Sequence, residues 1–235
     1  MENARSPIVS PSWDVPEGRY RDSQMTPLEL AASAWLDGFY QLEHVLAARE
    51  WAIRLARAPS LELRFAALVH DAERFFPGGP SGTPQNGFDD PDYLFVHSTR
   101  SADIVDAWLA ENDDTTSAAF RKRVRALILR HEIGGNREED ILQAADSLSF
   151  LSTFDWLVVS WVRDGHYTIA GAGEKLDWML NRIRVPEARE LALPFYVRIV
   201  TALERAKDDS VDTVGRRRQA SDRAHLLGTG NATAV

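Results

Sequence analysis

Residues 130–151 read RHEIGGNREEDILQAADSLSFL, and this stretch indicates how the surrounding chain folds. The side chain of Asn136 can cap a helix, and Glu139, three residues later, can reach back to the Asn136 backbone. Apolar residues then recur at three- and four-residue spacing through Leu148, which is the period of an amphipathic helix. We therefore expect a helix from Asn136 onward that carries Asp146 among apolar neighbours.

The same helical period extends in both directions from this stretch. Strand-like alternating runs joined by Asn-Gly or Asp-Gly hairpins are missing. The sequence therefore predicts an all-α fold, with helices over Thr26 to about Ala56 and Ser60 to Phe76, helices starting at Asp90-Pro91, Ser117 and Asn136, and two or three more after residue 152.

Length and composition favour one domain with mobile ends. The chain has 235 residues, 44% of them hydrophobic, which is enough for one substantial core. Periodicity is lost in 1–25 and 208–235, so we expect tails there and a domain over 26–207.

The overall charge and the N-terminal sequence restrict the expected partners and location. A net charge of −8 opposes nucleic acid and anionic membrane surfaces, so neither is an expected partner. No apolar run approaches the ~20 residues of a membrane span, and the N-terminus does not resemble a signal peptide. A cytoplasmic location is the expectation.

The chain contains no cysteine, so histidine, aspartate and glutamate are its only strong metal ligands. Four of the six histidines fall once per expected helix, and two aspartates accompany them in apolar surroundings. A buried carboxylate costs several kcal/mol or more unless a cation or a full set of hydrogen bonds is nearby. One or two divalent ions would meet that need for the set His44, His70, Asp71, His97, His131 and Asp146.

Three segments of the chain resemble the HD phosphohydrolase superfamily: ALVHDAERF (67–75), HSTRSADIV (97–105) and the 130–151 stretch. The resemblance covers about residues 40–152 and implies a single helical HD-domain bundle with additional C-terminal helices. It implies that His44, His70, Asp71 and Asp146 bind a primary metal and that Asp71 bridges to a second. The same resemblance places His97 and His131 at positions that two-metal members use.

The resemblance also implies a reaction, in which hydroxide on the metal attacks the phosphorus of a small phosphorylated substrate, a nucleotide being the commonest choice. The metal itself stays open among Mn, Fe, Co, Ni, Zn and Mg. Around Asp71, Glu73 could orient a water or a ligand imidazole. Candidates to hold the substrate phosphate are Arg74 and Arg100, with Arg130 and Lys122 as weaker choices.

Two alternatives remain open at this stage. Some HD proteins resemble myo-inositol oxygenase and use two irons, and the segment Tyr40-Gln41-Leu42-Glu43-His44 is a little like that branch. A metal- or ligand-binding protein without turnover is the other, because a fold does not fix a function. The loop from Pro77 to Asp90 is expected to cover the site, His166 to be solvated, and Gly171-Ala172-Gly173 to break a helix.

Overall fold

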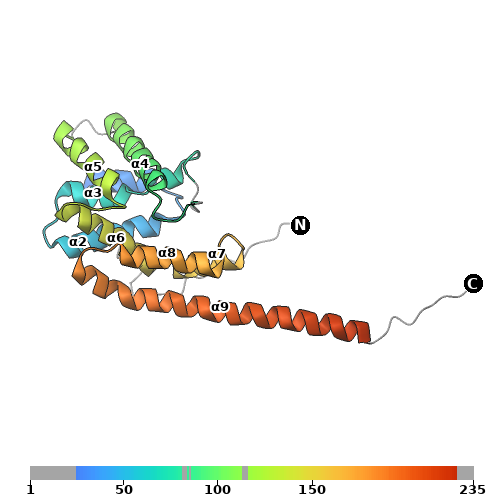
Figure 1. Ribbon diagram of the computed structural model, residues 1–235. Coiled ribbons are helices and arrows are strands. Elements are labelled where there is room, and N and C mark those ends of the chain that lie inside the picture. Colours follow the sequence, from blue (N-terminus) through green and yellow to red (C-terminus); the bar gives the residue numbers. More distant parts are fainter. Residues whose placement is uncertain (1–24, 81–83, 85, 113–115, 227–235) are drawn as a thin grey trace, which may run out of the picture.

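A computed structural model of the chain describes residues 25–80, 84, 86–112 and 116–226, with side chains up to residue 206. The described residues form an all-helical bundle without strands, which confirms the predicted fold class (Figure 1). The elements are α1 (Pro27–Trp35), α2 (Leu42–Ala56), α3 (Leu61–Val69), the 3-10 helix η1 (Ala72–Phe75), α4 (Pro91–Asn112), α5 (Ala118–Arg130), α6 (Arg137–Thr153), α7 (Asp155–Arg163), α8 (Ile169–Asn181) and α9 (Pro186–Leu226).

Helix α6 is the central element. Its start is the predicted capping box, because Asn136 accepts hydrogen bonds from the backbone of Glu138 and Glu139 while the Glu139 side chain returns to the Asn136 backbone. Every residue from Ile141 to Leu151 is buried. A helix that is buried on all sides must lie between two packed layers rather than on the surface.

Two hydrophobic cores flank α6. The first is built from α1 to α5 and takes Leu142 and Ala145 from α6. The second is built from α7, α8 and α9 and takes Ala144, Leu148 and Leu151. Helix α2 packs along α6, and α9 lies against α6 from the other side (Figure 1). Side chains that project from α2, α3 and α6 can therefore meet between the two cores.

Two predicted helices are shorter in the structure than the sequence period suggests. The single helix expected from Thr26 to Ala56 is divided into α1 and α2, with Gly38 between them at φ 83°, a left-handed backbone conformation that glycine adopts readily. The helix expected to reach Phe76 ends at Val69, and η1 replaces its last turn. Apolar spacing alone does not register such breaks.

The C-terminal part also differs from the expected boundaries. Helix α9 continues to Leu226, past the boundary at 207, and Pro194 lies inside it. At the other end, Met25 is buried in the first core, whereas 1–24 lie outside the described residues, as do 227–235. Helix α8 runs through Gly171-Ala172-Gly173, so the expected break there is wrong; Thr168 caps this helix by accepting from Gly171 N.

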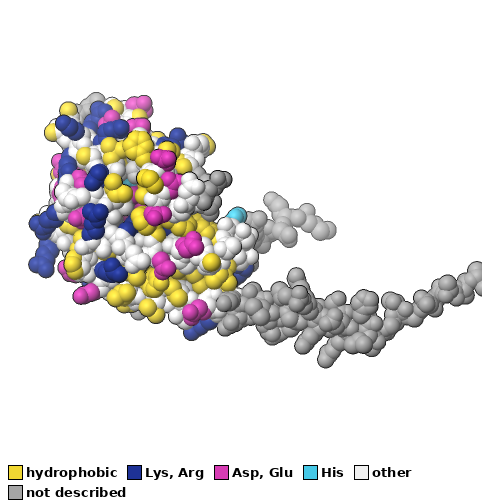
Figure 2. All heavy atoms as spheres, in the orientation of Figure 1, with side chains coloured by type: hydrophobic (Ala, Val, Ile, Leu, Met, Phe, Trp, Pro, Cys, Tyr) yellow, Lys and Arg dark blue, Asp and Glu magenta, His cyan; other side chains and the backbone are white. Residues whose placement is uncertain are grey.

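The face drawn in Figure 2 shows Lys and Arg side chains gathered along one edge, and hydrophobic side chains spread over the lower part, where α8 and α9 lie. Among the described helices, none combines the length and hydrophobicity needed to cross a lipid bilayer.

Candidate metal centre

The structure brings all six predicted ligands together between the two cores. His44 lies in the first turn of α2, His97 on α4 and Asp146 on α6, whereas His70 and His131 are the residues directly after α3 and α5. We call the set His44, His70, Asp71, His97, His131 and Asp146 the six-ligand cluster. The helix ends after Val69 and Arg130 therefore position two of its members.

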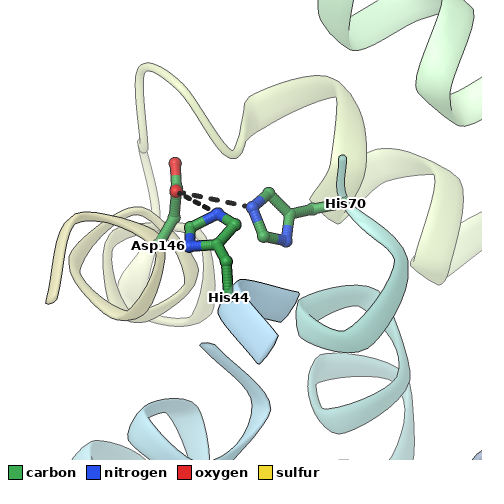
Figure 3. A group of neighbouring side chains, drawn as sticks. All are labelled: His44, His70 and Asp146. Carbon is green, nitrogen blue, oxygen red and sulfur yellow. Dashed lines mark ion pairs between the residues drawn. The ribbon is translucent and has the colours of Figure 1, made fainter. Parts of the chain in front are cut away.

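The first half of the cluster is His44, His70 and Asp146 (Figure 3). The Oδ1 atom of Asp146 lies 3.4 Å from His44 Nε2 and 3.4 Å from His70 Nε2. Asp71 Oδ2 lies 3.7 Å from His44 Nε2. Four donors from α2, from the end of α3 and from α6 thus converge on one point.

The second half is Asp71, His97 and His131. Asp71 Oδ1 lies 3.0 Å from His97 Nε2 and 3.9 Å from His131 Nε2, and the two Nε2 atoms are 3.2 Å apart. Asp71 Oδ2 thus faces His44, and Asp71 Oδ1 faces His97 and His131, while Oδ1 also lies 4.0 Å from His70 Nε2. This is the arrangement required of a carboxylate that bridges two ions.

Each imidazole is oriented through its other ring nitrogen. Nδ1 of His70 lies 3.0 Å from Ala67 O, Nδ1 of His131 lies 2.7 Å from Ile128 O, and Nδ1 of His97 lies 2.7 Å from Glu73 Oε1. A carbonyl or carboxylate oxygen can only accept, so these three nitrogens carry hydrogens.

The fourth imidazole, that of His44, is oriented in the same way by a serine side chain. Ser149 Oγ lies 2.9 Å from His44 Nδ1 and donates its hydrogen to Asp146 O at 2.8 Å. Because its single hydrogen is used there, Ser149 must accept from His44. In all four histidines Nε2 is thus the nitrogen left to bind a cation, as in metal sites whose ligand imidazoles donate their other N–H to a carbonyl or carboxylate.

The ligand atoms are placed to bind a divalent ion rather than to form hydrogen bonds with one another. His70 is fully buried, and its Nε2 has no hydrogen-bond partner among the described residues. A buried polar atom without a partner costs about 1–3 kcal/mol. An ion between Asp146 and His70 would satisfy it, and a set of nitrogen and carboxylate donors suits Mn, Fe, Co, Ni or Zn.

The charged neighbours in the cluster shift the pKa values of its histidines and carboxylates. Burial alone lowers the pKa of His70, but Asp71 and Asp146 outweigh it and raise this pKa to about 9. Burial, together with His97 and His70, lowers the pKa of His131 to about 4 against the opposing effect of Glu132. Burial raises the pKa of Asp71, yet the surrounding histidines hold it well below its usual value. Protonated His70 thus supplies positive charge at the place where a bound metal ion would supply it.

Four members of the cluster, His44, Asp71, His97 and Asp146, line a pocket of about 330 Å³, whereas His70 and His131 are not part of its lining. Of the substrate candidates, Arg74 lines this pocket; it donates to Pro80 O at 2.9 Å and to Tyr93 Oη at 2.5 Å, and its Nε lies 3.0 Å from Glu73 Oε1. The walls are mainly aromatic, formed by Tyr40, Tyr93, Phe150, Phe154, Trp161 and Tyr167.

The other predicted residues lie outside the pocket lining. Arg100 donates to Pro77 O at 2.5 Å, and Arg130 is 47% exposed with its Nε 3.6 Å from Glu139. Lys122 is exposed on α5. Glu73 does not line the pocket, and its Oε1 lies 2.7 Å from His97 Nδ1.

The sequence reasoning missed three charged residues of this site: Glu132, Lys175 and Arg182. Glu132 directly follows His131, and this adjacency to a candidate ligand was the only feature of the sequence that could have indicated a place in the site. Lys175 and Arg182 come from α8 and its C-cap, beyond the 40–152 segment of the resemblance. His166 is exposed as expected, yet it also lines the pocket, whereas the described residues of the 77–90 loop do not.

No protein-family model, no curated protein and no solved structure matches this chain. The geometry of the site therefore carries the functional argument by itself.

Proposed function

We propose that the protein is a metal-dependent phosphohydrolase that acts on a small phosphate ester or phosphoanhydride. The observation that carries this proposal is the convergence of four histidine Nε2 atoms and two carboxylates beside a pocket that four of these six residues line, with Asp71 between two ligand groups. When bound there, divalent ions would lower the pKa of a water, polarise the phosphoryl oxygen and offset developing negative charge.

The pocket offers a cation for an anionic substrate. Lys175 makes no hydrogen bond or ion pair with any described residue, and its Nζ lies over the rings of Phe88 and Phe150 at 5.0 and 5.4 Å. Burial lowers its pKa, with Glu132 opposing and Arg182 adding to that effect. An anion bound beside Nζ would give Lys175 a hydrogen-bond partner. Hydrogen bonds between two charged groups are stronger than those between neutral groups.

The position of Lys175 suits a phosphate held at the metal centre. Phe150 lies one helical turn after Asp146 on α6, a rise of about 5–6 Å. Burial lowers the pKa of Lys175, whereas Glu132 and Asp146 both raise it, so an anion held at the metal centre would lie near its ammonium group. Arg74, which donates to Tyr93 Oη, also lines the pocket and is the second candidate contact.

The aromatic walls favour a substrate with a flat apolar group. The Phe154 ring is tilted by 31° against the His44 imidazole, with 4.9 Å between the ring centroids. Successive rings of Phe150, Phe154, Trp161 and Tyr167 have their centroids 5.2, 6.4 and 5.4 Å apart. Such rings bind planar groups through offset stacking. 4-Nitrophenyl phosphate combines the two features and is a suitable first probe.

The test is phosphate release from 4-nitrophenyl phosphate and a panel of phosphate esters after loading the protein with Mn, Mg, Co or Zn. We expect metal-dependent release that Asp71→Asn abolishes. Lys175→Gln should raise KM by about 10–100-fold, which corresponds to the about 1.5–3 kcal/mol of a hydrogen bond to a charged group. Lys122→Gln, an exposed lysine on α5, is the matched control and should leave KM unchanged.

Two outcomes would favour the alternatives. Oxygen consumption that requires iron, without phosphate release, would favour a di-iron oxygenase. Tight binding of metal and of 4-nitrophenyl phosphate without turnover of any ester would favour a ligand-binding protein.

A further inference from the structure

Glu132 is a buried carboxylate whose two oxygens face in different directions. Its Oε2 forms an ion pair with Arg182, whereas its Oε1 lies 3.7 Å from His97 Nε2 and 3.8 Å from His131 Nε2. The inner oxygen thus faces the two histidines of the second half of the cluster. Neither the six-ligand pattern nor the helical period assigns this residue a role.

The spacing of these atoms can be compared with that around a metal ion. Ions such as zinc hold nitrogen and oxygen donors at about 2.0–2.2 Å, so the donors of a tetrahedral ion lie about 3.3–3.6 Å apart. Five of the six distances among Asp71 Oδ1, His97 Nε2, His131 Nε2 and Glu132 Oε1 are 3.0, 3.2, 3.7, 3.8 and 3.9 Å. These distances extend from slightly below to slightly above the about 3.3–3.6 Å expected between the donors of a tetrahedral ion.

The first half of the cluster has the same form. Asp146 Oδ1 lies 3.4 Å from both His44 Nε2 and His70 Nε2, and Asp71 Oδ2 completes the set at 3.7 Å from His44. Each half then holds two imidazoles, one oxygen of Asp71 and one oxygen of a further carboxylate. We propose that Glu132 is the fourth protein ligand of a second metal ion, equivalent to Asp146 at the first.

Arg182 supports this assignment as a positioning residue. Its guanidinium forms ion pairs with the outer oxygens of both Asp146 and Glu132, and its Nε donates to Ser147 Oγ at 2.8 Å. Each carboxylate therefore presents a single inner oxygen to its pair of histidines. A planar donor fork holds two carboxylates at a fixed separation, which lysine cannot do.

The charges of this arrangement suit an anionic ligand. Three carboxylates and Arg182 leave a formal charge of −2 around two divalent ions, so a positive centre remains beside the pocket. This inference rests on the metal centre of the proposed function, but not on the reaction assigned to it.

The experiment is titration of the metal-free full-length protein with Mn²⁺, followed by calorimetry and electron paramagnetic resonance. We expect two ions per wild-type chain, with the second producing the spectrum of a magnetically coupled pair. Glu132→Gln keeps an oxygen for Arg182 but removes the charge, and should weaken only the second ion, by at least about 10–100-fold, the range known for changes in groups that merely support ligands. Glu132→Asp, which withdraws the carboxylate by one methylene, should weaken the same ion less.

Glu43→Gln is the matched control. Glu43 also adjoins a ligand histidine in sequence, but it is exposed and does not line the pocket. Both ions should bind this variant as they bind the wild type. Arg182→Lys should weaken both ions, because Arg182 orients both carboxylates.

Several results would overturn the inference. A wild-type chain that binds one ion, or a Glu132→Gln protein that binds the second ion unchanged, contradicts the role of Glu132. Equal weakening of both ions with a lowered melting temperature would make Glu132 a structural partner of Arg182 instead. A wild-type chain that binds no ion would contradict the proposed function itself, which separates that failure from the failure of this inference.

Discussion

At the scale of single residues, the site depends on how each imidazole is turned. Two of the four histidines use the carbonyl three residues earlier, Ala67 for His70 and Ile128 for His131. These contacts follow from the position of each histidine just after a helix end. His44 and His97 instead need side chains, Ser149 and Glu73, from distant parts of the chain.

Ser149→Ala tests this orientation. Without Ser149 Oγ the Nδ1 hydrogen of His44 loses its acceptor, so the ring can rotate away from Asp146. We expect the affinity for the first metal ion to fall by about 10–100-fold. Calorimetric titration with Mn²⁺ measures this affinity. Ser152→Ala is the control, because Ser152 lies on the same helix but bonds to Trp51 and to Ser149 O, and it should leave the affinity unchanged. Equal affinities for the two variants would contradict the orienting role.

At the scale of elements, the helix that supplies Asp146 depends on its N-terminal cap. Asn136→Ala removes the acceptor for two backbone N–H groups of α6. The free energy of unfolding should fall by about 0.5–2 kcal/mol, as measured by urea denaturation. Asn112→Ala, which removes only a bond to Trp108 O near the exposed end of α4, serves as the control. A fall no larger than that of the control would mean that α6 does not need this cap.

A second element-scale prediction concerns the ion pairs that join α1 to α2 and α3. Glu29 is buried, and its oxygens lie 2.6 Å from Arg49 and 2.8 Å from Arg64. Burial raises the pKa of Glu29, but the bonds from Arg49 and from the Thr26 backbone outweigh it, so the pKa is lowered from 4.5. The stability that Glu29 contributes is therefore fully present above about pH 4.5 and is lost as the pH falls through the lowered pKa.

Glu29→Gln should lower the free energy of unfolding at pH 7, toward the lower end of about 3–5 kcal/mol, because Arg49 retains Glu50 as a partner. The difference from wild type should shrink as the pH falls below about 4.5. Urea denaturation at several pH values measures it, with Glu111→Gln, an exposed glutamate on α4, as control. A difference that stays constant with pH would refute the assignment.

The elements also show what a sequence can and cannot predict. The cap at Asn136 and the set of six candidate ligands were predictable, because caps and spaced histidines are local patterns. The break at Gly38 and the continuation of α8 through Gly171 depend on packing, which local patterns do not record. Lys175 and Arg182 reach the pocket only because α8 packs against α6. Such residues could not be found without the fold.

At the scale of the whole molecule, the candidate metal centre lies where the two hydrophobic cores meet. His44 and Asp146 come from the central helices α2 and α6, and the remaining ligands belong to the layer of the first core. Ions bound to the native cluster, but not to the unfolded chain, must therefore stabilise the entire bundle.

Melting temperature measures this coupling. An ion present at 100 times its Kd adds about 2.7 kcal/mol, and about 2–4 °C follows per kcal/mol for a chain of this size, so each ion should raise Tm by about 5–11 °C. Excess chelator should reverse the rise. A protein whose Tm does not respond to Mn, Fe, Co, Ni or Zn would contradict the coupling of metal to fold.

The most direct test of the central claim is the number of metal ions per chain. The purified protein would be reconstituted with a divalent metal, desalted and subjected to elemental analysis beside a His70→Ala/Asp71→Ala double variant whose folding is confirmed by circular dichroism. The account predicts two ions per wild-type chain and none in the folded variant. No ion in the reconstituted wild type, or equal metal content in both proteins, would contradict it.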